Sequence, residues 1–87
     1  MAKTEVRMAI DPFKVVAQAL NKVKKKPSMA RIIAIDYDET ADVLYIKFKH
    51  SKTVDNEALD EDGLILASLN QQDEIIGLTI MEASTFT

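Results

Sequence analysis

Four apolar runs, each about as long as one β-strand, follow one another after residue 29. They are ARIIAIDY (30–37), DVLYIKFK (42–49), GLILASL (63–69) and EIIGLTIM (74–81). The first, second and fourth runs are rich in Ile, Val, Tyr and Phe, which favours strands over helices. The connections after the first and third runs are of hairpin length, whereas the middle one is longer. The sequence therefore predicts a four-stranded antiparallel β-meander over residues 30–86, with residues 53–54 or 58–59 as candidates to extend a strand into the long connection.

One helix is predicted before the strands, over residues 11–26. Asp11 is a suitable N-cap because its carboxylate accepts hydrogen bonds from the first turn, and Pro12 is tolerated at the first helical position. A proline after a run of lysines marks the end of the helix. The apolar stripe of this helix is expected to consist of Phe13, Val16, Ala17, Leu20 and Val23. We expect the helix to pack on the sheet, which gives an α+β fold in one domain with residues 1–10 as an N-terminal arm.

Side-chain alternation gives the predicted sheet two apolar faces. The face expected under the helix carries Ile33, Ile35, Tyr37, Leu44, Ile46, Phe48, Ile76, Leu78 and Ile80. The second face carries Ile32, Val43, Tyr45, Ile75 and Met81. Large exposed apolar patches usually mark contacts. We therefore expect a homo-oligomer, with a dimer as the first guess, that associates through the second face; the alternative is that the arm 1–10 folds over it.

Charge is divided unevenly along the chain. Residues 1–31 carry eight Lys/Arg against two acids, and residues 32–87 carry three Lys against twelve acids, which together give the net charge of -3. A basic cluster that is a candidate contact for phosphate groups of nucleic acid consists of Lys22, Lys24, Lys25, Lys26 and Arg31. Lysines at a helix C-terminus also interact favourably with its dipole, and the chain has no recognised nucleic-acid motif. Nucleic-acid contact is therefore an alternative and not the first expectation.

Residues with catalytic or metal-binding chemistry are few. The chain has no cysteine, which excludes a disulfide, a thiolate metal site and a cysteine nucleophile. His50 is the only histidine, and no G-x-S-x-G turn supplies a serine nucleophile. The segment 55–63 resembles a calcium loop, but placing Gly63 at the glycine position puts Ala58 and Leu69 where carboxylates are required. We expect no enzyme activity, no catalytic residue and no cofactor, and weak divalent-metal or small-molecule binding by the acidic loops stays an alternative.

Two features bear on where the protein is found. The first ten residues lack the continuous apolar core of a signal peptide, and no apolar window is long enough to cross a bilayer. The absence of cysteine agrees with a reducing compartment. We therefore expect a cytoplasmic protein without a membrane contact.

The acidic turn between the first two runs fits a corner of the fold, since Asp38 and Glu39 are typical of a type I turn. It also lies inside a longer motif. YDETADVLYI (37–46) and IIGLTIMEAS (75–84) resemble the opening and closing motifs of a family of small prokaryotic proteins, the domain-of-unknown-function family 2283. Its members read approximately Y-D-x-x-A-D-x-L-Y-I and I-V-G-I-E-I-L-x-A-S. The resemblance covers residues 32–86 and departs at Thr79, where the family usually has a glutamate.

The resemblance implies a compact β-rich domain with no established biochemical activity. It also implies an alternative role as an antitoxin or partner-binding protein, because some members are encoded beside small toxin-like proteins. Such antitoxins often combine a basic DNA-binding element with a partner-binding surface, which suits the divided charge. Our first expectation is a non-enzymatic interaction or assembly module that self-associates.

Overall fold

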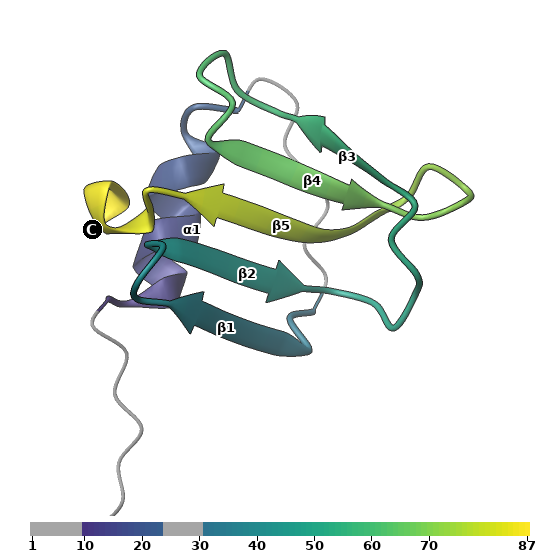
Figure 1. Cartoon of the computed structure of the whole chain (residues 1–87), viewed down its shortest axis with the longest axis horizontal. Coiled ribbons are helices and arrows are strands. Elements are labelled where there is room, and N and C mark those ends of the chain that lie inside the picture. The colour runs from purple at the N-terminus through teal and green to yellow at the C-terminus, as the bar shows by residue number, and fades with distance from the viewer. Residues whose placement is uncertain (1–9, 24–30) are drawn as a thin grey trace, which may run out of the picture.

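A computed structural model describes residues 10–23 and 31–87 of the 87-residue chain. The elements are α1 (Pro12–Leu20), β1 (Ala34–Asp38), β2 (Val43–Lys47), β3 (Asp55–Ala58), β4 (Ile65–Leu69), β5 (Ile75–Met81) and the 3-10 helix η1 (Ala83–Phe86). The strands form one antiparallel sheet, and α1 lies behind it in Figure 1. The predicted α+β class is confirmed. The predicted arm, apart from Ile10, and the helix residues 24–26 lie outside the described residues.

The predicted sheet is confirmed as antiparallel and corrected in strand number and order. It contains five strands in the order β1-β2-β5-β4-β3, so the last strand inserts beside β2. The fifth strand, β3, has the sequence DNEA, and all four of its residues are exposed. It pairs with β4 from Asp55 opposite Leu69 to Ala58 opposite Leu66. A strand of this composition is formed by main-chain pairing at a sheet edge, which strand propensity does not reveal.

The N-terminus of α1 is as predicted, whereas its end and its buried face differ. The Asp11 carboxylate accepts hydrogen bonds from the backbone N–H groups of Phe13 (3.0 Å) and Lys14 (3.4 Å). The helix ends at Leu20 because the next three backbone N–H groups bond to carbonyls only three residues back, which tightens the chain. Its buried residues are Val15, Val16 and Ala19, followed by Val23 beyond the helix end. The predicted stripe is therefore wrong for Phe13, which is 63% exposed, and for the exposed Ala17.

The core lies between α1, η1 and the inner face of the sheet, which is the face towards α1. The predicted inner residues of β2 are confirmed, since Leu44, Ile46 and the following Phe48 are all buried in one cluster with the helix residues. Leu78 and Ile80 of β5 join the same cluster. The 3-10 helix adds the buried Ala83 and Phe86 beside α1. The inner face is thus covered within the chain.

An irregularity between β4 and β5 reverses part of the predicted alternation. Ser68 lies opposite Gly77 and Leu69 lies opposite Ile75, so Ile76 is an extra residue with no partner in β4. An inserted residue of this kind shifts the side chains on one side of it to the other face. Ile75 consequently packs against the core cluster, which corrects its assignment to the second face. Ile76 is buried but does not belong to that cluster, which corrects its assignment to the face under the helix. Ile32 also packs against the core cluster, and its assignment to the second face is wrong because it precedes β1 and does not follow the alternation of that strand.

Candidate functional site

The acidic turn between β1 and β2 is tied to the C-terminal end of the chain by Asp42. Its carboxylate accepts hydrogen bonds from the Tyr37 hydroxyl (2.5 Å), the Ser84 hydroxyl (2.6 Å) and the Ser84 backbone N–H (3.0 Å). The Asp42 carbonyl also accepts a bond from the Ala83 backbone N–H (3.0 Å). Asp42 adopts a φ of 56°, a left-handed conformation that aspartate tolerates better than most residues. These bonds join the β1–β2 turn to η1, and we call the three side chains Tyr37, Asp42 and Ser84 the corner node.

The corner node shifts the titration of two groups away from neutral pH. The hydrogen bond to Asp42 is the main cause that raises the pKa of Tyr37 to about 12, with burial and neighbouring carboxylates adding to it. Hydrogen bonds from Ser84 and then from Tyr37 lower the pKa of Asp42. A general acid or base works best with a pKa near the operating pH, and both shifts lead away from it. The structure therefore supports the interpretation of this turn as a corner of the fold.

A second polar node holds the β4–β5 turn and was not foreseen from the sequence. The buried Asn70 side chain accepts hydrogen bonds from the backbone N–H groups of Gln72 and Glu74, both at 3.0 Å, and donates to the Glu74 carboxylate at 2.9 Å. Lys49 binds the other oxygen of that carboxylate at 2.8 Å and is the main cause that lowers the pKa of Glu74. Each of these side chains has a structural partner. The role of this node is to fix the turn.

The acidic loop between β3 and β4 uses its first carboxylate in the same way. Asp60 accepts hydrogen bonds from the backbone N–H groups of Leu64 (3.3 Å) and Ile65 (2.9 Å), which close the turn at Gly63. Over residues 10–23 and 31–87, no group of three or more His, Cys, Asp or Glu side chains is arranged to hold a metal ion. His50, the only histidine in the sequence, is exposed beyond the end of β2.

The predicted basic cluster falls only in part within the described residues. Lys24, Lys25 and Lys26 lie outside them, and Arg31 is exposed ahead of β1. The Lys22 ammonium lies 4.0 Å from the Asp62 carboxylate and 5.5 Å from the centre of the Phe86 ring. Lys22 therefore has two contacts within the fold, one of them an exposed ion pair that contributes little to stability.

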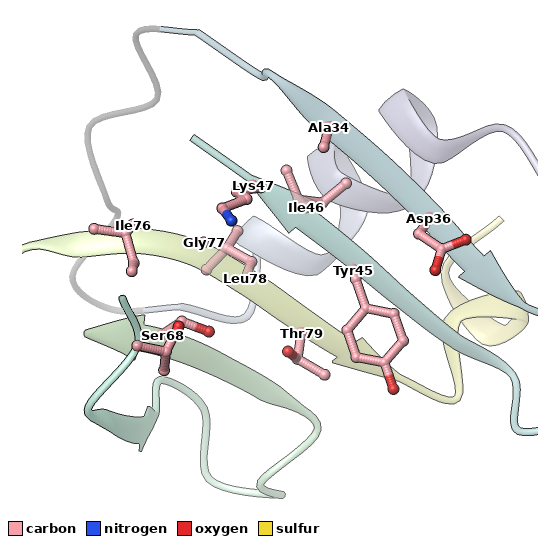
Figure 2. A pocket seen from close by; sticks show the side chains of 11 residues that line it. Ala34, Asp36, Tyr45, Ile46, Lys47, Ser68, Ile76, Gly77, Leu78 and Thr79 are labelled. Carbon is pink, nitrogen blue, oxygen red and sulfur yellow. The ribbon is translucent and has the colours of Figure 1, made fainter. Parts of the chain in front are cut away.

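The face of the sheet away from α1, the outer face, carries a hollow in its centre (Figure 2). Its volume is about 280 Å³. Four strands and Thr53 of the β2–β3 loop surround it. The strand residues on the outer face are Ala34, Asp36, Tyr45, Lys47, Ser68, Ile76, Gly77 and Thr79. The floor is low because position 77 has no side chain. A Cβ there would lie 2.7 Å from the Ile46 carbonyl oxygen, so the packing of β2 against β5 requires glycine.

The predicted self-association residues are distributed unevenly over this outer face. Tyr45 stands on it with 45% of its surface exposed, and Met81 is 39% exposed. Val43, which pairs with Met81, is buried. Ile32 and Ile75 belong to the inner side, as described above. The outer face is thus less apolar than predicted, and Tyr45 is its main exposed aromatic group among the described residues.

Comparison with protein families agrees with the family resemblance noted in the sequence. The family described as "Protein of unknown function (DUF2283)" matches residues 34–84. The chain belongs to this family. Comparison with curated proteins and with solved structures gave no match. The DUF2283 match runs from the start of β1 into η1 and excludes α1.

The two motifs of the DUF2283 resemblance meet in the folded chain. Tyr37 and Asp42 of the opening motif bond to each other, and Asp42 also bonds to Ser84 of the closing motif. Thr79, which stands where the family usually has a glutamate, lines the hollow of the outer face. The motif residues of the corner thus hold the β1–β2 turn against η1, and Thr79 lies on the outer face. In the part of the chain that the structure describes, no helix has the length and apolar character to span a membrane.

Proposed function

We propose that this protein is a non-enzymatic interaction module that self-associates through the outer face of its sheet. The observation that carries the proposal is the contrast between the two faces. The inner face is covered by α1 and η1, whereas no helix or strand of the described residues lies over the outer face (Figure 1). Two sheets commonly pack face to face, with side chains of the two faces interdigitating.

The exposed groups of the outer face support a protein partner. Tyrosine is enriched at protein interfaces because its ring buries a large apolar area and its hydroxyl tolerates water. Tyr45 is flanked by Asp36 on β1 and Thr79 on β5, the residues opposite it in the sheet. Aromatic residues are enriched at the core of interfaces between proteins, and polar residues surround them at the rim.

We propose a non-enzymatic role because the carboxylates that could act in catalysis hold turns of the fold. The carboxylates of Asp42, Asp60 and Glu74 each accept hydrogen bonds that hold a turn or a corner. The pKa shifts of Asp42 and Tyr37 favour the protonation states that these bonds require. A catalytic centre instead needs groups whose protonation changes during a reaction.

Native mass spectrometry of the protein freshly purified from cells tests the proposal. We expect a clean multiple of the 9.7 kDa chain mass, and we expect Tyr45→Glu to give a folded monomer because it places charge in the interface. Phe13→Glu is a matched control, since Phe13 is an exposed aromatic residue on α1, and its assembly state should stay that of the wild type.

Either of two results would contradict self-association through this face. A bare wild-type monomer would remove the proposal, and an unchanged assembly state for Tyr45→Glu would move the interface away from the outer face. A mass that includes bound nucleic acid would instead support the alternative function through the basic cluster of Lys22, Lys24, Lys25, Lys26 and Arg31.

A further inference from the structure

We infer that two copies pack their outer faces about a two-fold axis, and that Tyr45 of each copy fills the hollow above Gly77 of the other. This inference rests on the proposed self-association and adds which side chain enters which site. In a two-fold interface the same patch serves both subunits, so a projecting group and the cavity that receives it must both be present on one chain. The outer face has both.

The register of the strands arranges the outer face in two neighbouring rows. The first row crosses the sheet through Ala34, Lys47, Gly77 and Ser68, which are paired in that order. The second row, two residues further along each strand, runs through Asp36, Tyr45, Thr79 and Leu66. The first row is low because three of its four side chains are small or absent. The second row contains Tyr45, whose ring projects beside the hollow in Figure 2.

A two-fold axis in the plane between the sheets, inclined to the rows so that β2 of one copy crosses β5 of the other, places each Tyr45 ring above Gly77 in the low row of the partner. Stacked sheets lie about 10 Å apart, so their side chains must interdigitate in this way to exclude water. The same rotation seats both Tyr45 rings at once. The shape of the outer face therefore complements itself.

The size of the hollow favours a single side chain as its occupant. Pockets for cofactors and drug-sized ligands usually have volumes of about 300–1,000 Å³ and bury most of the ligand. The hollow, at about 280 Å³, is at the small end of that range and is open on the outer face, so it would leave much of such a ligand exposed. An aromatic anchor seated in a pocket near the centre of an interface is the typical source of binding energy between proteins.

Charge on the outer face has the same complementarity. Asp36 stands in the row of Tyr45, and Lys47 stands in the low row. Among the described residues neither has an ion-pair partner within its own chain. Placing the second row of one copy over the first row of the other brings Asp36 towards the row of the partner's Lys47, and the two-fold axis makes this match twice. Opposite charges in facing rows fix the register of an interface.

A size-swap experiment tests the reciprocal seating of the two rings. Tyr45→Ala removes the projecting ring, and Ala34→Trp fills the hollow from an exposed position on β1. We expect each variant alone to be monomeric in native mass spectrometry, with an unchanged far-ultraviolet circular dichroism spectrum that shows it is folded. An equimolar mixture should restore a dimer with one copy of each variant, because one native contact remains and the introduced tryptophan ring occupies the space that the missing Tyr45 ring leaves.

The control pairs Ala34→Trp with Phe13→Ala, which removes an exposed aromatic residue from α1 and leaves the outer face intact. We expect Phe13→Ala to remain a homodimer and to form no mixed dimer, because its Tyr45 would meet the introduced tryptophan. A wild-type monomer would end both the proposed function and this inference. A wild-type dimer that survives Tyr45→Ala or Ala34→Trp, or two monomeric variants that do not pair on mixing, would overturn the seating of Tyr45 alone.

Discussion

The two tyrosines of the chain show how position decides the use of the same side chain. Tyr37 is part-buried and donates its hydroxyl hydrogen bond to Asp42 in the corner node, where it links β1 to the end of the chain. Tyr45 lies on the neighbouring strand with its ring exposed on the outer face. Both residues lie within the segment that matches DUF2283. The same side chain is therefore used once inside the fold and once on its exposed surface.

The titration of Tyr37 gives a direct test of the corner node. Tyr45→Phe leaves Tyr37 as the only tyrosine, so ultraviolet absorbance then reports its ionisation alone. We expect a pKa of about 12 in the folded protein, and a value closer to the ordinary 10.0 when Asp42→Asn is added, because the carboxylate acceptor and its charge are removed. A folded Tyr45→Phe protein that titrates near 10.0 would contradict the hydrogen bond.

The raised pKa of Tyr37 also makes the stability of the folded protein decrease at high pH. The pKa of Tyr37 is higher in the folded state than in the unfolded state, so its contribution to stability is full below pH 10 and is lost as the pH rises towards 12. The denaturant midpoint of Tyr45→Phe should therefore fall over this interval by more than that of a Tyr37→Phe variant, which lacks the group. Equal falls in the two variants would contradict the linkage.

At the scale of elements, the sequence predicts the strands that have a local residue pattern. It does not predict strands or side-chain orientations that depend on pairing with another strand. The runs that form β1, β2, β4 and β5 are recognisable because β-branched and aromatic residues favour strands. The prediction misses β3 because DNEA has no such preference and exists as a strand through pairing with β4. The predicted position of Ile75 is wrong because alternation counted along one strand cannot reveal an extra residue relative to its partner.

The outer-face hollow also cannot be predicted from single strands. Tyr45 is placed on the correct face by alternation, since its neighbours Leu44 and Ile46 are buried on the other side. The low row requires Ala34, Gly77 and Ser68 to align across strands that are far apart in the sequence. The order β1-β2-β5-β4-β3 creates that alignment, and a simple meander would not.

The close approach of β5 to β2 at Gly77 can be tested by substitution. Gly77→Ala should lower the free energy of unfolding by roughly 1–3 kcal/mol, because its Cβ would press on the Ile46 carbonyl oxygen and separate β2 from β5. Urea denaturation followed by circular dichroism measures this change. Ser68→Ala is the matched control, since Ser68 lies opposite Gly77 and lines the same hollow. It removes only an exposed hydrogen bond to Asn56 (3.3 Å), so it should lower stability by no more than about 0.5–1 kcal/mol. Equal effects of the two substitutions would mean that the close approach of the strands is unimportant.

At the scale of the whole molecule, a small sheet with one covered face has limited means to stabilise itself. An 87-residue chain buries a smaller fraction of its surface than a large domain does, and no disulfide adds to its stability. Association through the outer face would bury further surface and couple folding to assembly. That coupling distinguishes an assembly module from a monomer that happens to expose an aromatic residue.

Mass action makes the coupling measurable, because a partner that binds only the folded state raises stability with concentration. For a dimer, each tenfold increase in protein concentration adds about 1.4 kcal/mol to the free energy of unfolding. We expect the wild-type melting temperature to rise by a few degrees per tenfold increase and that of Tyr45→Glu to be independent of concentration.

Leu78→Ala is the control for a loss of stability without a loss of assembly. It removes a buried core contact worth about 2–5 kcal/mol, so it should lower the melting temperature at every concentration and keep the wild-type slope. A wild-type melting temperature that does not depend on concentration would show that folding proceeds without assembly.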